Sequence, residues 1–354
     1  MLTFICPLPP PTHGMANVNQ MMLDRLAEAG RVDAINVAGR LEDAGPRAKL
    51  RKTVSTLKAL PRLVRNRMGG SGSAYGSVDD GSGGYLTALW TGVARLLGYR
   101  IYLHHHSFRY LVATTRPMRV LTRVAGRGAV HVVLCETMAE ALRERYPCAC
   151  NIRVVPNPVT LPAQAGAGIA AGDRPYTIGM LANLTFEKGT GRYLEILRRL
   201  DDAGAPVRGV LAGPSKDPAV ERAIVAMQSS RPGLLDWLGR VSGEAKERFF
   251  SDIDCFLLPS RSEAYPLVIV EALARGVPVI ALAVGCIPSL GHLSAVTVIG
   301  QDEDFVETAA AQIALRATAS DRAKETARSL EEGLALIAAN NRALNDLVGE
   351  LVGG

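Results

Sequence analysis

The chain has 354 residues, of which 48% are hydrophobic and 21% are charged, a balance that is typical of globular proteins and excludes a disordered or fibrous chain. The length predicts two domains. The formal charge of +6 is modest, and we expect no nucleic-acid partner. Because no stretch reaches the roughly 18 apolar residues of a membrane span and the first residues lack a basic lead-in, we expect a cytoplasmic protein.

The first half alternates strand-like and helix-like segments. Apolar runs at 2–6, 32–37, 101–103, 130–135 and 152–155 predict strands, and residues 18–29 and 137–146 predict helices. Residues 69–84 are rich in Gly and Ser and predict a loop that holds one short strand near residues 74–78. The Gly/Ala-rich stretch 163–172 predicts a linker, so we place one domain at 1–165 and the other at 166–354.

A basic segment runs from Arg47 to Arg67 and contains eight Lys or Arg residues and no acid. Apolar residues recur in it at helical spacing, namely Leu50, Val54, Leu57 and Leu60, with Leu63 and Val64 beyond Pro61. Two interpretations follow. The segment is a solvated helix that packs its apolar side on the first domain, or it touches anionic membrane lipid or a lipid-linked, phosphate-bearing acceptor. The second would make the protein peripheral at the inner face of the membrane.

The second half shows the clearer alternation. Apolar runs at 176–181, 207–212, 234–238, 254–258 and 277–281 predict parallel strands buried on both faces. The amphipathic stretches 191–203, 218–228, 243–250 and 266–275 predict crossover helices, which together give a doubly wound α/β sheet. Residues 320–352 predict one long helix that packs back on either domain.

One glutamate interrupts an otherwise apolar helix. Between Pro266 and Ala274 every residue is apolar except Glu271, and a helix that is apolar all round is buried. A buried ionised carboxylate needs a partner. Glu271 therefore pairs with an Arg or Lys of a neighbouring element, or it accepts hydrogen bonds from a ligand such as a ribose diol. Glu263 precedes it by eight residues in the loop at a strand's carboxyl end, where α/β sheets bind ligands and a helix N-terminus favours an anion.

These residues carry a family resemblance. Glu263-x7-Glu271, preceded by Pro259-Ser260 and followed by ALARGVPVIA, resembles the signature of the retaining GT-B glycosyltransferases known as glycosyltransferase family 4, or glycosyl transferases group 1. Further matching segments are Val155-Pro156-Asn157, Glu187-Lys188-Gly189, Leu211-Ala212-Gly213, Leu238-Gly239 and His13-Gly14-Met15. The resemblance implies the GT-B fold, two Rossmann-like domains facing across a cleft.

The resemblance also implies roles for individual residues. Glu263 lies by the donor sugar hydroxyls, Glu271 binds the ribose and Lys188 neutralises the diphosphate; the other interpretation of Lys188 is an exposed loop lysine. The implied donor-binding set is Gly14, Asn183, Lys188, Gly213, Gly239, Glu263, Ala264, Tyr265, Leu267 and Glu271. An arginine that many members carry is missing here, so Asn183 contacts the phosphate in its place, and Ala264 stands where Gly is usual.

Two clusters suggest metal ligands but favour other interpretations. His104, His105 and His106 follow a strand, where neighbouring side chains point to alternate faces, so a single ion does not easily take all three. The family places a histidine facing the donor sugar, and His106 is the best match. Asp252 and Asp254 mark the end of a helix and the start of a strand. We expect no metal and no cofactor.

The sequence thus predicts a glycosyltransferase of hexosyltransferase type, with Glu263, His106 and Lys188 as its catalytic residues. It would move a sugar from a nucleoside diphosphate to a sugar, lipid-linked or small-molecule acceptor, with retention, in polysaccharide, glycolipid or other glycoconjugate synthesis. The alternatives are a nucleotide-sugar epimerase, a phosphorylase and a non-catalytic nucleotide-sugar-binding module. A dinucleotide-dependent dehydrogenase is disfavoured, because no G-x-G-x-x-G follows the first strand of either half.

Overall fold

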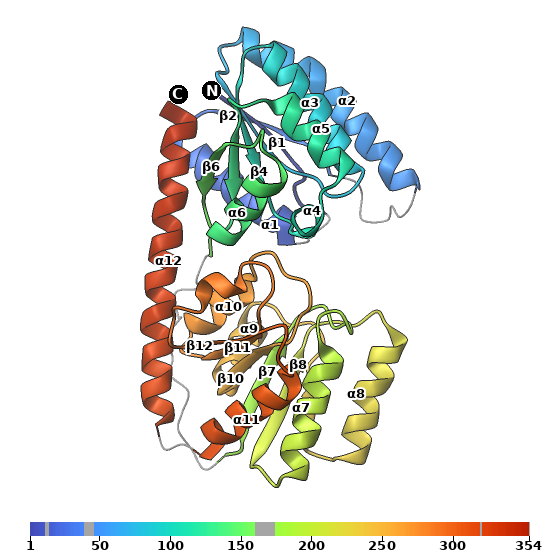
Figure 1. The fold of residues 1–354 in the computed structure, drawn as a ribbon, viewed down its shortest axis with the longest axis vertical. Helices are drawn as coiled ribbons and strands as arrows, with labels where there is room; N and C mark the ends of the chain where they lie inside the picture. The colour runs from blue at the N-terminus through green and yellow to red at the C-terminus, as the bar shows by residue number, and fades with distance from the viewer. Residues whose placement is uncertain (11–13, 39–45, 160–173, 319–320, 354) are drawn as a thin grey trace. The chain divides into compact units, whose positions relative to one another are not determined.

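A computed structural model describes residues 1–10, 14–38, 46–159, 174–318 and 321–353 (Figure 1). The chain forms two compact units. Unit 1 comprises Met1–Pro158 together with Asn340–Gly354, and unit 2 comprises Val159–Ala339. The predicted linker 163–172, and with it the predicted boundary after residue 165, lies outside the described residues.

Unit 1 contains a six-stranded parallel sheet in the order β2-β1-β3-β4-β5-β6. Its strands are β1 (Leu2–Cys6), β2 (Val32–Asn36), β3 (Ser73–Ser77), β4 (Arg100–His104), β5 (Val130–Val133) and β6 (Asn151–Val154). Its connecting helices are α1 (Gly14–Ala29), α2 (Pro46–Met68), α3 (Gly83–Leu96), α4 (Arg109–Val112), α5 (Arg116–Ala125) and α6 (Glu136–Arg145). Strands and helices alternate as expected for parallel pairing with crossovers.

The prediction of one short strand near residues 74–78, inside the Gly/Ser-rich stretch 69–84, is confirmed by strand β3. Strand β3 lies between β1 and β4, and all five of its residues are buried. Its small residues are explained by the helix above it, because a Cβ at Gly76 would lie 2.5 Å from the Trp90 ring and 2.8 Å from the Ile5 carbonyl oxygen. Gly and Ser residues, which are typical of loops, here allow the strand to pack closely against the helix.

Helix α2 continues through Pro61 for 23 residues. Ala59 and Leu63 are fully buried against the unit, whereas Leu50, Val54 and Leu57 are exposed. The first interpretation of the basic segment, in which its apolar side packs on the domain, is therefore wrong for these three residues. Helices α2, α3 and α5 lie side by side on one face of the sheet (Figure 1).

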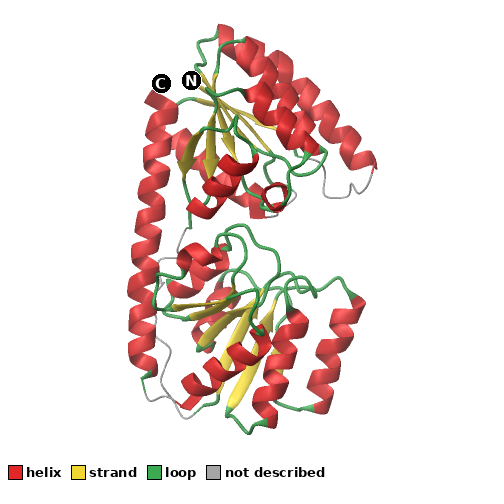
Figure 2. Ribbon diagram, in the orientation of Figure 1, coloured by secondary structure: helices red, strands yellow, loops and turns green. Residues whose placement is uncertain are grey.

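Unit 2 contains a second six-stranded parallel sheet in the order β12-β11-β10-β7-β8-β9 (Figure 2). Its strands are β7 (Tyr176–Leu181), β8 (Val207–Ala212), β9 (Leu235–Trp237), β10 (Cys255–Leu258), β11 (Val279–Leu282) and β12 (Val296–Ile299). Its helices are α7 (Thr190–Asp202), α8 (Pro218–Ser230), α9 (Glu244–Asp252), α10 (Leu267–Leu273), the 3₁₀ turn η1 (Ile287–Leu290) and α11 (Phe305–Thr318). The predicted β/α alternation is confirmed, while β12 and α11 were not predicted.

The predicted terminal helix is α12 (Arg322–Gly353). Its first part belongs to unit 2, where a Cβ on Gly333 would lie 2.4 Å from the Ala274 nitrogen, so α12 approaches the end of α10 very closely. Its last part belongs to unit 1, where four leucine and valine residues join the core around Leu2 and Phe4. Among the helices described, none has the length and apolarity needed to cross a bilayer.

Candidate active site

The loop between β7 and α7 presents Lys188. Within it the Lys188 backbone N–H donates to Thr185 Oγ1 (3.0 Å) and the Gly189 N–H donates to the Phe186 carbonyl (3.1 Å). Gly189 has a φ of +89°, and a Cβ there would lie 2.3 Å from the carbonyl oxygen of Pro259. Only glycine allows both the left-handed backbone and this approach. The lysine loop is thus locked against the loop that follows β10.

Lys188 and Glu263 form an ion pair at the carboxyl edge of this sheet. Strands β7 and β10 are neighbours, and Lys188 Nζ donates to Glu263 Oε1 (2.7 Å) and to the Ser262 carbonyl (3.1 Å). The Lys188 side chain is 33% exposed and that of Glu263 is 14% exposed. The Lys188 ammonium therefore lies at the carboxyl ends of the strands, which is where α/β sheets bind ligands. It is paired with a carboxylate and remains in contact with solvent.

Gly285, which the sequence reasoning missed, supports the Glu263 loop. It follows β11 with a φ of +59°, and a Cβ there would lie 2.2 Å from the Glu263 carbonyl oxygen. The Cys286 N–H donates to the Ala264 carbonyl (2.8 Å). The available signal was a glycine in the loop four residues after the predicted strand 277–281, because an isolated glycine near a strand end can mark close backbone approach.

Glu271 projects from α10 to meet α9. Lys246 Nζ donates to Glu271 Oε1 (2.7 Å), so the predicted ion pair with a neighbouring element is present, and Lys246 was not foreseen as its partner. The Lys246 side chain is 27% exposed and that of Glu271 is 20% exposed. Pro266 is the cap of α10 rather than its first residue. Ala264 and Leu267 are partly exposed before and at the start of this helix, whereas Tyr265 is buried.

Gly213 follows β8, where the end of β7 approaches so closely that no other residue fits in its place. Gly213 has a φ of +118°, its N–H donates to the Gly239 carbonyl (2.6 Å), and a Cβ would lie 1.8 Å from the Ala182 carbonyl oxygen. Trp237 Nε1 donates to the Gly213 carbonyl (3.0 Å). Asn183 follows Ala182 and is exposed. Gly213, Gly239 and Asn183 thus lie at the same edge as Lys188.

The two remaining predicted residues, Gly14 and His106, belong to unit 1. Gly14 begins α1, and no atom of the described residues lies within 4 Å of the position that a Cβ would take there. His106 follows β4 and packs against His104, with ring centroids 4.1 Å apart and ring planes tilted by 42°. His105 turns the other way and shares a hydrogen bond with His131 (Nε2 to Nδ1, 2.9 Å), which confirms the predicted alternation.

Burial keeps these imidazoles neutral. It lowers the pKa of His106 and of His131 to about 4, and burial followed by the neighbouring imidazoles lowers the pKa of His104 and His105 well below the usual range. Among the described residues, Nε2 of His106 has no hydrogen-bond partner. It is a neutral ring with one free nitrogen at the carboxyl edge of the sheet.

The candidate metal pair has a structural role. Asp254 Oδ2 accepts from Arg174 Nη1 (2.7 Å) and from the Thr177 N–H (2.8 Å), which ties the start of β10 to β7. Asp252 ends α9, as predicted, and Asp254 lies directly before β10, which begins at Cys255, one residue later than predicted. Within the described ranges, no group of three or more His, Cys, Asp or Glu side chains is placed to hold a metal ion.

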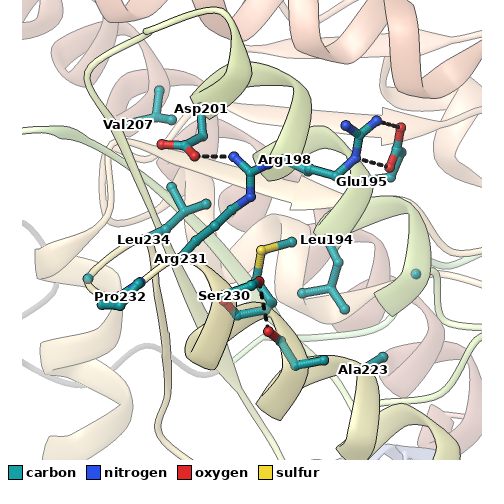
Figure 3. Close-up of a pocket in the computed structure, with 14 residues that line it drawn as sticks. Leu194, Glu195, Arg198, Asp201, Val207, Ala223, Ser230, Arg231, Pro232 and Leu234 are labelled. Atoms are coloured by element: carbon teal, nitrogen blue, oxygen red, sulfur yellow. Dashed lines mark hydrogen bonds and ion pairs between the residues drawn. The ribbon is translucent and has the colours of Figure 1, made fainter.

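Two cavities of unit 2 lie apart from the predicted donor residues. One of about 1060 Å³ runs between α7 and α8 toward the first residue of β8, at the amino end of the strands, and ion pairs from Arg198 to Glu195 and from Arg231 to Asp201 line it (Figure 3). The other, about 400 Å³, lies near the end of β11 and contains Arg192. Burial, followed by the positive charge of Arg261, lowers the pKa of Arg192.

Comparison with known proteins finds a family match within unit 2. Residues 167–329 match the sequence model of the family described as glycosyl transferases group 1. The protein is a glycosyltransferase. The matched segment contains the Lys188 loop, the Gly213 turn and both glutamates, which are the features that build the carboxyl edge of unit 2. No individually curated protein sequence matches the chain.

Solved structures show that this glycosyltransferase has the GT-B fold. It is similar to sucrose-phosphate synthase from Thermosynechococcus elongatus (TM-score 0.74, 16% identity, 99% of this chain and 98% of that one). It is also similar to Anabaena HepE in complex with UDP (0.72, 15%, 99% of each chain) and to WaaG, a glycosyltransferase involved in lipopolysaccharide biosynthesis (0.71, 12%, 100% of each).

Proposed function

We propose that the enzyme transfers a sugar from a nucleoside diphosphate to an acceptor hydroxyl, with retention of the anomeric configuration. The observation that carries the proposal is the Lys188–Glu263 pair (2.7 Å) at the carboxyl edge of unit 2, with the Glu271 carboxylate on the helix that follows. The similar HepE structure is a complex with UDP, which supports a nucleotide at a site of this fold. Retention rests on the resemblance of the Glu263-x7-Glu271 segment to the family signature.

The charges of this edge suit a diphosphate. In the free protein Lys188 is neutralised by Glu263, and an arriving diphosphate would take over the ammonium, since hydrogen bonds between charged groups are the strong ones. Glu263 would then be released to accept hydrogen bonds from the sugar hydroxyls. Glu271 would exchange part of its contact with Lys246 for the ribose diol.

The proposed step breaks the bond between the anomeric carbon and the diphosphate oxygen and forms one between that carbon and the acceptor oxygen. The electron pair of the broken bond leaves with the nucleoside diphosphate, and the acceptor's hydroxyl proton passes to the leaving diphosphate. Lys188 stabilises the charge that develops on the leaving oxygens. The cation of Lys188 takes the place that a metal ion has in other phosphate chemistry, so we propose that none is required.

The family resemblance also suggests roles for two residues of unit 1. His106 would face the donor sugar as a neutral hydrogen-bonding group, and Gly14 would leave room for the donor at the start of α1. The neutral state of His106 follows from its lowered pKa, so at neutral pH it would act by orienting a hydroxyl group and not by its charge.

Two substitutions test this division of roles. Glu271→Gln should weaken binding of the free nucleoside diphosphate at least tenfold, because a hydrogen bond to a charged group contributes about 1.5–3 kcal/mol and the ribose is present in both donor and product. Glu263→Gln should not weaken that binding, since it frees Lys188, but it should depress turnover of the intact donor. Isothermal titration and donor hydrolysis measure the two effects.

Glu331→Gln is the matched control, because Glu331 is an exposed carboxylate of α12 in the same unit. It should change neither quantity. If Glu263→Gln and Glu271→Gln give the same pattern of binding and turnover, the assigned roles are wrong.

A further inference from the structure

The positive charge of this chain is concentrated in one segment. Residues 46–127 contain fifteen of the 40 basic residues but only two of the 34 acidic ones, a formal charge of +13 in a chain whose total is +6. The two acids, Asp79 and Asp80, already pair with Lys52 and Arg109. The excess therefore belongs to this part of unit 1 and is not neutralised within it.

Helices α2, α3 and α5, which lie side by side, belong to this segment (Figure 1). Four arginines in and just after α5 are exposed and have no acidic partner among the described residues, namely Arg116, Arg119, Arg123 and Arg127. The first three recur every three or four residues along α5, so they form one row, and Arg127 follows the end of the helix. On α2, Arg51, Lys58 and Arg65 are exposed seven residues apart and form a second row.

Exposed apolar side chains accompany these basic rows. On α2, the exposed fractions are 66% for Leu50, 40% for Val54, 49% for Leu57, 41% for Val64 and 84% for Met68, and Pro61 is also exposed. Their spacing alternates between four and three residues, which places them on a single line of the helix. On the neighbouring α3, Tyr85, Leu89 and Leu96 are exposed at similar spacing. An apolar stripe of this length on a protein surface marks an interaction site.

A second copy of this chain does not fit the stripe. The alternating spacing is that of a coiled coil, but pairing of two α2 helices requires complementary charges beside the seam. Helix α2 has no acidic residue, so two copies would bring Arg51, Lys58 and Arg65 against basic residues. The occupant must supply both negative charge and an apolar layer, and an anionic lipid surface supplies them together.

We propose that the face formed by α2, α3 and α5, which we call the basic-apolar face, binds peripherally to an anionic lipid bilayer. The apolar stripe enters the boundary between headgroups and acyl chains, while the arginine and lysine rows contact lipid phosphates. This inference does not rest on the proposed sugar transfer, because it uses residues other than those at the donor site.

Flotation of the full chain with vesicles tests the proposal. It should bind phosphatidylcholine vesicles that contain phosphatidylglycerol and not vesicles of phosphatidylcholine alone, and binding should fade as salt rises because exposed charges are screened. The triple variant Arg116→Gln, Arg119→Gln, Arg123→Gln should bind at least tenfold more weakly. Its control, Arg222→Gln, Arg248→Gln, Arg328→Gln, removes the same charge from exposed residues of unit 2 and should bind like wild type.

A second pair of variants tests the apolar stripe. Leu50→Gln, Leu57→Gln, Met68→Gln should also lose at least tenfold, whereas Val225→Gln, Leu315→Gln, Leu334→Gln, at exposed apolar positions of unit 2, should not. Circular dichroism checks that each variant is folded. The proposal is overturned if wild type ignores anionic vesicles, if either control weakens binding as much, or if analytical ultracentrifugation shows a dimer that the α2 variant dissolves. It is also overturned if the stripe captures an acidic protein partner and no lipid.

Discussion

The two units share one architecture and place different chemistry at the same edge of their sheets. In unit 2 the carboxyl edge holds partly exposed ion pairs, Lys188 with Glu263 and, on the adjoining helices, Lys246 with Glu271. In unit 1 the corresponding edge holds neutral imidazoles, among them the buried His104 and the partly buried His106. The parallel sheet supplies only the place, and the residues at the strand ends decide what each edge binds.

This difference has an energetic consequence. The ion pairs of unit 2 contact solvent, so an anionic ligand can replace one partner at little desolvation cost. The imidazoles of unit 1 are already dehydrated, and charging any of them is unfavourable. Unit 2 is thus suited to exchange a carboxylate for a phosphate, and unit 1 is suited to keep a fixed, uncharged surface.

The largest expected effect concerns the turn that joins the strand ends of unit 2. Gly213→Ala places a Cβ 1.8 Å from the Ala182 carbonyl oxygen at a φ of +118°, so the turn must open. The left-handed backbone costs about 1–2 kcal/mol and overpacking costs about 1–3 kcal/mol more. We expect a loss of roughly 3 kcal/mol in the free energy of unfolding of unit 2, together with weaker nucleotide binding.

Gly233→Ala is the control, because Gly233 also has a positive φ (+83°) but has no atom within 4 Å of its Cβ. It should cost about 1 kcal/mol. The chain has two tryptophans, so urea unfolding followed by Trp237 fluorescence in a Trp90→Phe background reports unit 2. Equal losses in the two variants would show that the close contact at Gly213 is not structural.

Acidification should lower the stability of unit 1 more than that of unit 2. In unit 1 the folded pKa of His131 is about 4, below the unfolded value of roughly 6.5. The unfolded state therefore binds the proton first, and the stabilisation from the neutral ring, complete above about pH 6.5, is lost as the pH falls toward 4. At pH 5 this one group costs about 2 kcal/mol.

Unit 2 should resist the same change. Its carboxylates with lowered pKa include Glu247, hydrogen-bonded to Arg275, and they lose their stabilisation only below the ordinary carboxyl pKa of 4.5. Hydrogen exchange, corrected for intrinsic rates, should show lost protection at pH 5 in β4 and β5 but not in β7 and β10. His131→Gln should reduce the loss, and His292→Gln, at an exposed residue of unit 2, should not. Equal loss in both units would contradict the contrast.

Much of unit 2 could be predicted from the sequence, and less of unit 1. The strands at Tyr176–Leu181 and Val207–Ala212 match their predicted bounds, because apolar runs between turn residues are an unambiguous pattern for buried parallel strands. Strand β3 was expected as one short strand inside a loop, but its burial at the centre of the sheet was not, because only the packing of Trp90 explains its small residues. Exposure on α2 also depends on packing, so the sequence left both interpretations of the basic segment open.

The site divides in the same way. The positions of Lys188, Glu263 and Glu271 followed from the motif and from strand order. Their partners did not, because Lys246 and Gly285 lie on separate elements whose contacts depend on the folded geometry. The neutral state of His106 was likewise invisible in the sequence, since it results from burial.

The central claim is that unit 2 binds a nucleoside diphosphate through Lys188. The most direct test is isothermal titration of uridine, guanosine and adenosine diphosphates onto wild type, Lys188→Ala and Lys324→Ala, the last at an exposed lysine of the same unit. Wild type should bind one of the three, Lys324→Ala should match it, and Lys188→Ala should bind at least tenfold more weakly, as the loss of a charge-assisted hydrogen bond of about 1.5–3 kcal/mol requires. Unchanged affinity in a folded Lys188→Ala protein would contradict the account.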